Sequence, residues 1–484
     1  MSRIRFGAIL RVLSALLFII GISISFCIPI SIYYKTTHLD TFVSSSLICI
    51  ILGVILKLSS KNKDKNVNKR EGYLIVALAW ITLWIACSIP YLLSGVFDSA
   101  TDLFFETMSG LTTTGATVLN DIESMSEDIL FWRSFTQWIG GMGIIVLTVA
   151  LLPLLGIGGI ELFVAEAPGP TSEKLHPRIK DTAKSLWFIY LGLTVILSVL
   201  LRIFGMNWFD SINHALTTMA TGGFSTKNSS VAHYGTGIQY VIIVFMFLAG
   251  VNYSLHYLAL RGKLKQVFQS DELKGYCIIV FSLILVVTIQ VYRVTDIPLE
   301  QSFREASFQI ISIVTTTGFV TADYTSWTEG LTLLFFVMLF LGACAGSTAG
   351  GIKLIRHIVF FKNSILEFKR LLHPRAMIRL KINKKIVPPR VLTHILVFLL
   401  LYIGTFVIGT LIVVSADVDL ITASGAVATS LSNVGPGIGE VGPVDNFDGF
   451  NDFIKWFLSF LMLLGRLELF TIYVILTPFF WRSH

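Results

Sequence analysis

The sequence predicts an all-α polytopic membrane protein, in which four M1–P–M2 pore-loop repeats surround one pore and two further helices precede them. Three observations support this fold class: an apolar composition, ten apolar segments of membrane-spanning length, and four copies of a short motif rich in Gly and Thr. Of the 484 residues, 54% are hydrophobic and 14% are charged, whereas soluble domains carry about 25% charged residues. This composition excludes a soluble enzyme, a disordered regulator and a nucleic-acid-binding protein.

Membrane-spanning helices need roughly 20 mostly apolar residues. The first candidate follows Arg3 and Arg5 like a signal peptide, but its apolar run is too long and no A-x-A cleavage site follows, so we expect it to be retained. The five cysteines lie in apolar runs without CxxC spacing and are expected to be core residues. The ten segments are 7–34, 41–59, 72–95, 132–157, 184–205, 237–260, 275–294, 329–359, 391–415 and 452–480.

Basic residues orient these spans. Most of the 37 Lys and Arg residues lie at 61–70, 174–184, 261–274 and 353–390, which are loops on one side of the membrane. Because basic loops stay in the cytoplasm, we expect both termini to be cytoplasmic, in agreement with an even number of spans. The formal net charge of +7 therefore marks a membrane face, so membrane lipid is an expected partner and nucleic acid is not.

The four motif copies define internal repeats. Each copy lies between two full spans and follows about 12–14 helix-compatible residues, which form roughly 20 Å of helix and cannot cross the bilayer. We therefore predict a re-entrant half-helix and a Gly turn in each of the repeats 72–158, 182–262, 274–360 and 389–482, after a two-helix N-terminal domain at 1–60. The turns are Thr113-Thr114-Gly115, Ala220-Thr221-Gly222, Thr316-Thr317-Gly318 and Asn433-Val434-Gly435.

This geometry favours a cation. Half-helices that enter from outside point their partly negative C-terminal ends toward the membrane centre. The turns can direct backbone carbonyls at an ion and replace its hydration shell, and Thr hydroxyls can add ligands. None of the four turns contains a charged side chain, which favours a monovalent cation over Mg²⁺ or Ca²⁺. The alternative is that the turns merely connect helices, but four copies at similar spacing favour a selectivity filter.

Two features within apolar spans are candidate gates. The segment 342–351 holds four Gly and three Ala, which indicates either a non-helical loop or close packing of small residues. Arg466 lies in an apolar run where an Arg costs about 3 kcal/mol, so it either faces a water-filled path or pairs with an acid such as Glu468. Arg133 is expected to be a snorkelling anchor, and Glu106 and His214 are expected to make packing or polar contacts on their half-helices.

At 132–143, 249–252, 342–353 and 465–468 the sequence resembles the K⁺-transporter superfamily of TrkH, KtrB and plant HKT proteins, and the resemblance extends over essentially the whole chain. The two leading helices resemble the TrkH branch. The resemblance implies channel-like K⁺ uptake across the inner membrane by a homodimer, with one pore per subunit. It implies K⁺ selectivity from Gly115, since Ser at this position in some plant members of the family accompanies Na⁺ transport. The fourth turn departs from the Thr-Thr-Gly pattern. The resemblance also implies a pore-blocking loop and an electrostatic barrier, formed by Gly346, Ser347, Thr348, Ala349, Gly350, Gly351 and Arg466.

The resemblance further implies a TrkA-type cytoplasmic regulator that binds NAD, ATP or ADP. Loops 165–184 and 361–390 are candidate docking surfaces, although their charge is also explained by membrane topology alone. No Walker motif is present, and we expect no enzyme activity and no cofactor bound by this chain, with K⁺ at the filter as the transported ion.

A K⁺ symporter coupled to H⁺ or Na⁺ is the alternative function. It would need a residue in the conduction path that can change charge, and Arg466 cannot titrate usefully. Glu468 keeps this alternative open. A non-conducting receptor or scaffold would leave four filter motifs unexplained.

Overall fold

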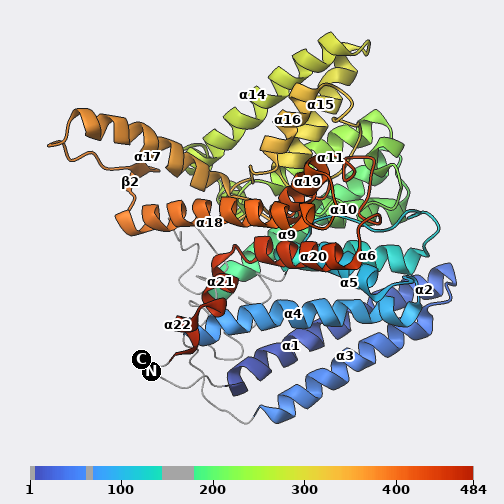
Figure 1. Cartoon of the computed structure of the whole chain (residues 1–484). Coiled ribbons are helices and arrows are strands. Elements are labelled where there is room, and N and C mark those ends of the chain that lie inside the picture. Colours follow the sequence, from blue (N-terminus) through green and yellow to red (C-terminus); the bar gives the residue numbers. More distant parts are fainter. Residues whose placement is uncertain (1–5, 61–68, 144–178, 483–484) are drawn as a thin grey trace.

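The computed structural model describes residues 6–60, 69–143 and 179–482, which are almost entirely helical (Figure 1). The strands within these ranges are β1 (Lys381–Ile382) and β2 (Lys385–Ile386), which pair in antiparallel fashion. The helices are α1 (Phe6–Ser25), α2 (Cys27–Tyr34), α3 (Leu39–Ser59), α4 (Lys69–Ser94), α5 (Ala100–Leu111), α6 (Glu127–Trp138), η1 (Ile139–Gly143), α9 (Ile179–Ile203), α10 (Trp208–Ala220), η2 (Ser230–His233), α11 (Thr236–Ala249), α12 (Tyr253–Leu260), α13 (Leu264–Phe268), α14 (Asp271–Val294), α15 (Leu299–Val314), α16 (Glu329–Met338), α17 (Leu354–Leu372), α18 (Pro389–Val414), α19 (Leu420–Ser432), α20 (Asp452–Arg466), α21 (Phe470–Leu476) and α22 (Pro478–Trp481).

Among the described residues, six helices are long and apolar enough to cross a membrane, or up to eight if each sharply bent helix pair counts as one span. The predicted helical membrane fold is therefore confirmed. Two predicted spans are not straight: 237–260 bends by 99° between α11 and α12, and 452–480 bends by 111° between α20 and α21. The span predicted at 329–359 is helical only to Met338 and again from Leu354. Of the span 132–157, residues 144–157 lie outside the described part.

The leading helices pack through small residues. Ser14 Oγ on α1 donates to the Gly53 carbonyl of α3, and Ser46 Oγ on α3 donates to the Gly21 carbonyl of α1, both at 2.7 Å. Glycines let two helix backbones approach this closely, and the hydroxyls then bond across the interface. The predicted helix 7–34 is broken at Phe26, between α1 and α2.

Several chain segments meet at one end of the bundle. Ser60 Oγ donates to the Gly7 carbonyl at 2.8 Å, and Arg70 Nη2 donates to the carbonyls of Phe479 at 3.3 Å and Arg482 at 2.8 Å. The start of α1, the end of α3, the start of α4 and the C-terminal helix therefore share one side.

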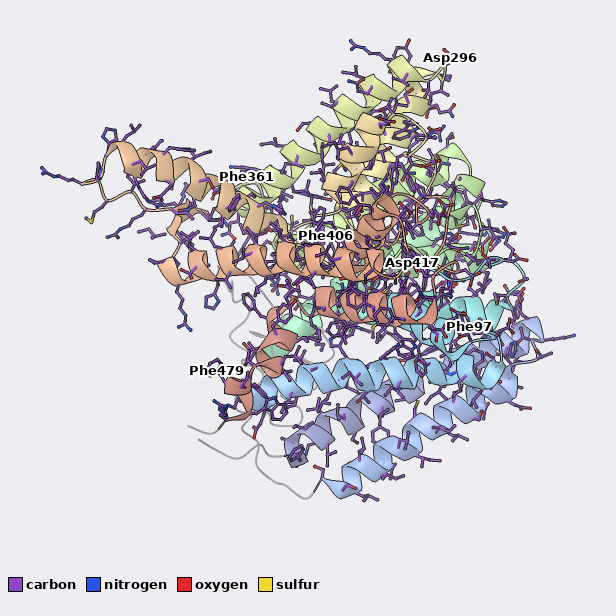
Figure 2. All side chains as sticks on the ribbon, viewed as in Figure 1. Phe97, Asp296, Phe361, Phe406, Asp417 and Phe479 are labelled. Atoms are coloured by element: carbon purple, nitrogen blue, oxygen red, sulfur yellow. The ribbon has the colours of Figure 1, made fainter. Side chains whose placement is uncertain are left out.

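The four predicted half-helices are α5, α10, α15 and α19, which have 12 to 16 residues. Three of them begin with a side-chain cap: Ser99 accepts from Thr101 N, Asn207 from Asp210 N, and Asp419 from Ile421 N and Thr422 N. Such caps satisfy N–H groups that have no partner within the helix. A separate arm, formed by α17 and the β1–β2 hairpin, projects from the bundle (Figure 1). Phe361 on this arm is 61% exposed (Figure 2).

Candidate ion-conduction site

All four half-helices end in the same backbone motif. A left-handed residue follows each helix end, its N–H bonds to the carbonyl three residues back, and the next N–H bonds to the carbonyl five residues back. This is the Schellman motif, which satisfies carbonyls at a helix end. A glycine of positive φ follows two positions after the left-handed residue. The pairs, with φ in degrees, are Thr113 (57) and Gly115 (83), Thr221 (53) and Gly223 (80), Thr316 (55) and Gly318 (80), and Asn433 (54) and Gly435 (101).

This equivalence changes the alignment of the second turn. Ala220 is the last residue of α10, and the triplet that matches the other three is Thr221-Gly222-Gly223. Gly223 was therefore missed by the sequence analysis. The sequence does not show which residue of this turn adopts the positive φ, because Gly222 and Gly223 are adjacent and either glycine tolerates it.

The turns contact one another in cyclic order. A Cβ atom added to Gly115 would lie 2.2 Å from the Gly222 carbonyl oxygen of the second turn. In each of the other three turns, a Cβ atom added to the positive-φ glycine would likewise lie close to a carbonyl oxygen of the next turn. These approaches leave no room for a side chain, so the turns enclose one axis. The remaining distances are 2.1 Å from Gly223 to Thr317 O, 2.0 Å from Gly318 to Val434 O, and 2.8 Å from Gly435 to Thr114 O.

Two side-chain oxygens of the first and fourth turns, Thr113 Oγ1 and Asn433 Oδ1, are buried without a hydrogen-bond partner in the described structure. The Asn433 amide nitrogen donates to Thr114 Oγ1 at 3.0 Å and to the Met462 carbonyl at 2.9 Å. Within the described ranges, no group of three His, Cys, Asp or Glu residues could hold a metal ion, so hydroxyl and amide oxygens are the available side-chain donors.

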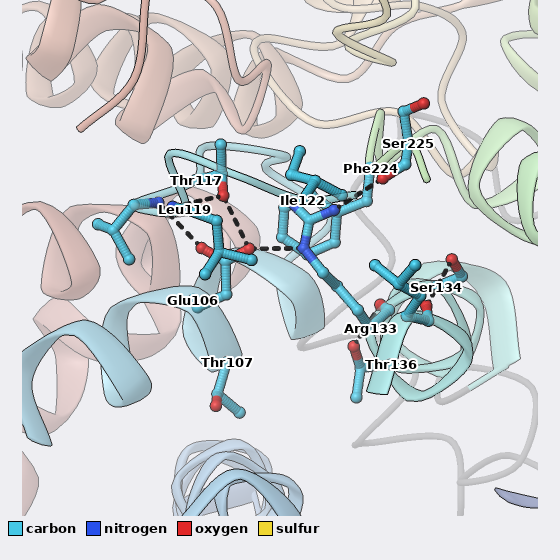
Figure 3. A network of polar contacts seen from close by, with 12 residues as sticks. Glu106, Thr107, Thr117, Leu119, Ile122, Arg133, Ser134, Thr136, Phe224 and Ser225 are labelled. Carbon is cyan, nitrogen blue, oxygen red and sulfur yellow. Dashed lines mark hydrogen bonds and ion pairs between the residues drawn. The ribbon is translucent and has the colours of Figure 1, made fainter. Parts of the chain in front are cut away.

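A buried ion pair contacts the segments that directly follow the first and second turns (Figure 3). Arg133 Nε lies 2.7 Å from Glu106 Oε1, and the two side chains are 3% and 0% exposed. Glu106 also accepts from Thr117 Oγ1 and Val118 N, both at 3.0 Å. Arg133 Nη1 donates to the Ser225 carbonyl at 3.0 Å. The expectation that Arg133 snorkels is therefore wrong, because its partner, 27 positions away, draws it inward.

Other polar side chains hold the second and third turns. Gln137 Nε2 donates to the Gly222 carbonyl at 2.6 Å, and Gln137 Oε1 accepts from Phe224 N at 3.1 Å. His214 Nε2 lies 3.0 Å from Ser225 Oγ. Gln309 Nε2 on α15 donates to Thr321 Oγ1 at 3.3 Å. Glu106, His214 and Gln309 each stand seven positions before the left-handed residue of their turn.

The segment 341–353 is a loop that lies against the third and fourth turns and against the end of α10. Gly350 N donates to Thr316 Oγ1 at 2.6 Å, and Thr348 Oγ1 donates to the Met219 carbonyl at 3.1 Å. A Cβ atom on Gly350 would lie 2.4 Å from the Ser432 carbonyl oxygen. Close packing of a small-residue helix, the alternative interpretation, is excluded because this segment is not helical.

Arg466 joins this loop to the first repeat. Its Nη1 donates to the Thr348 carbonyl at 3.0 Å, and its Nη2 donates to the carbonyls of Gly140 at 2.5 Å and Gly141 at 2.9 Å. Glu468, considered as its partner, instead pairs with Arg356. Of the predicted docking loops, 361–390 forms the arm, whereas 165–178 lies outside the described residues.

Comparisons with known proteins agree with this architecture. The profile of the TrkH family, described as cation transport proteins, matches residues 38–482. The chain is 39% identical to the Trk system potassium uptake proteins TrkH of Halomonas elongata, over 98% of this chain and 99% of that protein, and of Escherichia coli, over 99% and 100%. The crystal structure of the potassium transporter TrkH from Vibrio parahaemolyticus superposes with a TM-score of 0.88 at 36% identity and covers 99% of this chain and 100% of that one. The resemblance found in the sequence is thus confirmed, and the chain belongs to the TrkH family of cation transport proteins.

Proposed function

We propose that this protein takes up K⁺ across the inner membrane by channel-like conduction through the ring of four turns. The cyclic contact of the four glycine-containing turns carries this proposal, because it gives one axis lined by backbone from every repeat. The relatives named as potassium uptake proteins support K⁺ as the ion.

The filter would consist of 113–115, 221–223, 316–318 and 433–435. The four half-helices end at these turns, so their C-terminal dipoles favour a cation there. Backbone carbonyls replace water around a weakly hydrated ion at little cost. The unpartnered Thr113 and Asn433 oxygens are suited to the inner end of the same path, since a buried oxygen without a partner costs free energy that a bound cation recovers.

The loop 341–353 and Arg466 would form the gate on the inner side of the filter. The loop touches the third and fourth turns and the end of α10, and the guanidinium repels a cation that leaves the filter. Opening requires that the loop and Arg466 move away together, because Thr348 is bonded to Arg466.

The arrangement favours passive conduction over coupled transport. A symporter needs a residue in the path that changes its charge, and Glu468 is engaged with Arg356. Both termini would be cytoplasmic, with the basic arm on the same side. We propose that the arm is where a TrkA-type nucleotide-binding regulator docks on a homodimer.

Liposome flux with purified protein tests this function. K⁺ flux driven by its own gradient, and insensitive to an imposed proton gradient, is expected. Uphill K⁺ accumulation driven by H⁺ or Na⁺ would establish the symporter instead. Arg466→Ala should raise basal K⁺ flux, whereas Arg202→Ala, at an exposed site near the end of α9, should not.

A further inference from the structure

The chain turns sharply directly after Arg466. Glu468 (φ 54°) and Leu469 (φ 57°, ψ −56°) are consecutive non-glycine residues of positive φ, and Phe470 N bonds to the Glu468 carbonyl at 2.5 Å. This is a γ-turn of the rare, strained form. We call residues 467–469 the elbow. Such a conformation persists only where surrounding contacts impose it.

One contact that can impose it is the ion pair between Glu468 and Arg356. Arg356 lies in the first turn of α17 and is 7% exposed, and its guanidinium carbon is 3.8 Å from the centre of the Phe398 ring on α18. Arg356 Nη1 has no hydrogen-bond partner in the described structure. Glu468 is thus the carboxylate that compensates this buried charge.

The ion pair connects the two parts of the gate. Helix α17 follows the loop 341–353 directly, and Leu354 N donates to the Ala343 carbonyl at 3.0 Å. Arg466, two residues before Glu468, bonds to Thr348 within the same loop. Two links therefore join the loop region to the elbow, one through Arg466 and one through Glu468.

We propose that Arg356 and Glu468 are positioning residues that hold the elbow bent and thereby keep Arg466 against the carbonyls of Thr348, Gly140 and Gly141. Displacement of α17 that separates the pair releases the elbow, and Arg466 then leaves the axis. The inference rests on the gate role of Arg466 in the proposed function and adds the residues that enforce its position.

A purely electrostatic role would give a different pattern. If the pair acted only through its charges on the passing ion, Glu468→Gln would lower basal K⁺ flux and Arg356→Gln would raise it. A positioning role predicts that both substitutions raise the flux, since each breaks the same link. It also predicts that the exchange of the two charges, in R356E/E468R, restores a low flux.

The experiment measures basal K⁺ flux in liposomes that contain the full chain alone. We expect each single variant to raise the flux about fivefold or more, in the usual range of coupling between two sites, and the exchanged pair to return toward wild type. Arg356→Lys keeps the charge and should also stay low, which provides a test if the exchanged pair does not fold. Arg202→Gln, at the exposed site near the end of α9, lies outside the proposed filter, gate and arm and should leave the flux unchanged.

A second measurement reports the loop directly. Cys344 is fully buried in the loop, so its rate of modification by a polar thiol reagent, with the other four cysteines replaced, should rise in Glu468→Gln and fall again in the exchanged pair. Opposite flux changes in the two single variants, or unchanged flux in both while Arg466→Ala leaks, would overturn this inference alone. No leak in Arg466→Ala would overturn the proposed gate as well.

Discussion

Substitution of Arg133 by Met is expected to destabilise the protein and weaken its ion discrimination. The change keeps the bulk of the side chain but leaves the fully buried Glu106 side chain without its cation. Loss of one partner from a buried ion pair costs about 3–5 kcal/mol. Glu106 retains two donors, Thr117 Oγ1 and Val118 N, so we expect the lower end, about 3 kcal/mol.

The same change removes the hydrogen bond from Arg133 to the Ser225 carbonyl, which follows the second turn. Two of the four turns thereby lose support, and the ratio of K⁺ to Na⁺ flux in liposomes should fall. Equilibrium unfolding in mixed micelles, followed by Trp fluorescence, measures the stability change.

Two controls make this reasoning refutable. The double variant Glu106→Gln/Arg133→Met removes both charges and should regain wild-type stability to within about 1 kcal/mol. Lys227→Met breaks the partly exposed pair with Glu123 and should cost less than about 1 kcal/mol. If Arg133→Met costs no more than Lys227→Met, or if the flux ratio is unchanged, the pair does not support the filter.

Three further predictions concern the turns and their helices. Gly115→Ser should lower the K⁺-to-Na⁺ flux ratio, because its Cβ would lie 2.2 Å from the Gly222 oxygen; an equal ratio in both proteins would contradict filter control there. Gly318→Ala should abolish K⁺ flux without unfolding the chain, since its Cβ would lie 2.0 Å from Val434 O. Asp419→Ala should cost about 1 kcal/mol of stability through loss of the α19 cap. Hydrogen bonds from Thr422 and from neighbouring backbone N–H groups lower the pKa of Asp419, so this difference should be present at neutral pH and disappear as the pH falls through that lowered pKa.

Local patterns were sufficient to predict the four short helices and, in three of the four turns, the position of the positive-φ glycine. The apolar segment before each turn predicted the position of the helix. In three turns one glycine, Gly115, Gly318 or Gly435, predicted how the turn aligns with the others. The second turn was misaligned because its register depends on a distant contact: a Cβ on Gly222 would lie 2.4 Å from the Gln137 side chain. Only the folded chain brings that side chain to the turn.

Long-range pairing and helix breaks were harder to predict. Hydropathy reports how apolar a segment is and not whether it is straight, so the bends after Ala249 and Arg466 were missed. One local signal was available, since Asn252 caps α12 by accepting from Ser254 N at 2.8 Å. The partners of Arg133 and Glu468 lie 27 and 112 positions away, beyond any helical spacing.

The ring of turns is closed by a single chain, and this has a consequence for how its parts can differ. In a symmetric homo-oligomer every substitution appears once per subunit. Here each of the four contacts between neighbouring turns is made by different residues. A substitution can therefore change one contact and leave the other three unchanged. Three different polar side chains, Glu106, His214 and Gln309, stand at one repeated position, and the loop 341–353 belongs to the third repeat. One of the four repeats can therefore acquire its own residues while the ring of turns stays intact. Four identical subunits could not differ from one another in this way.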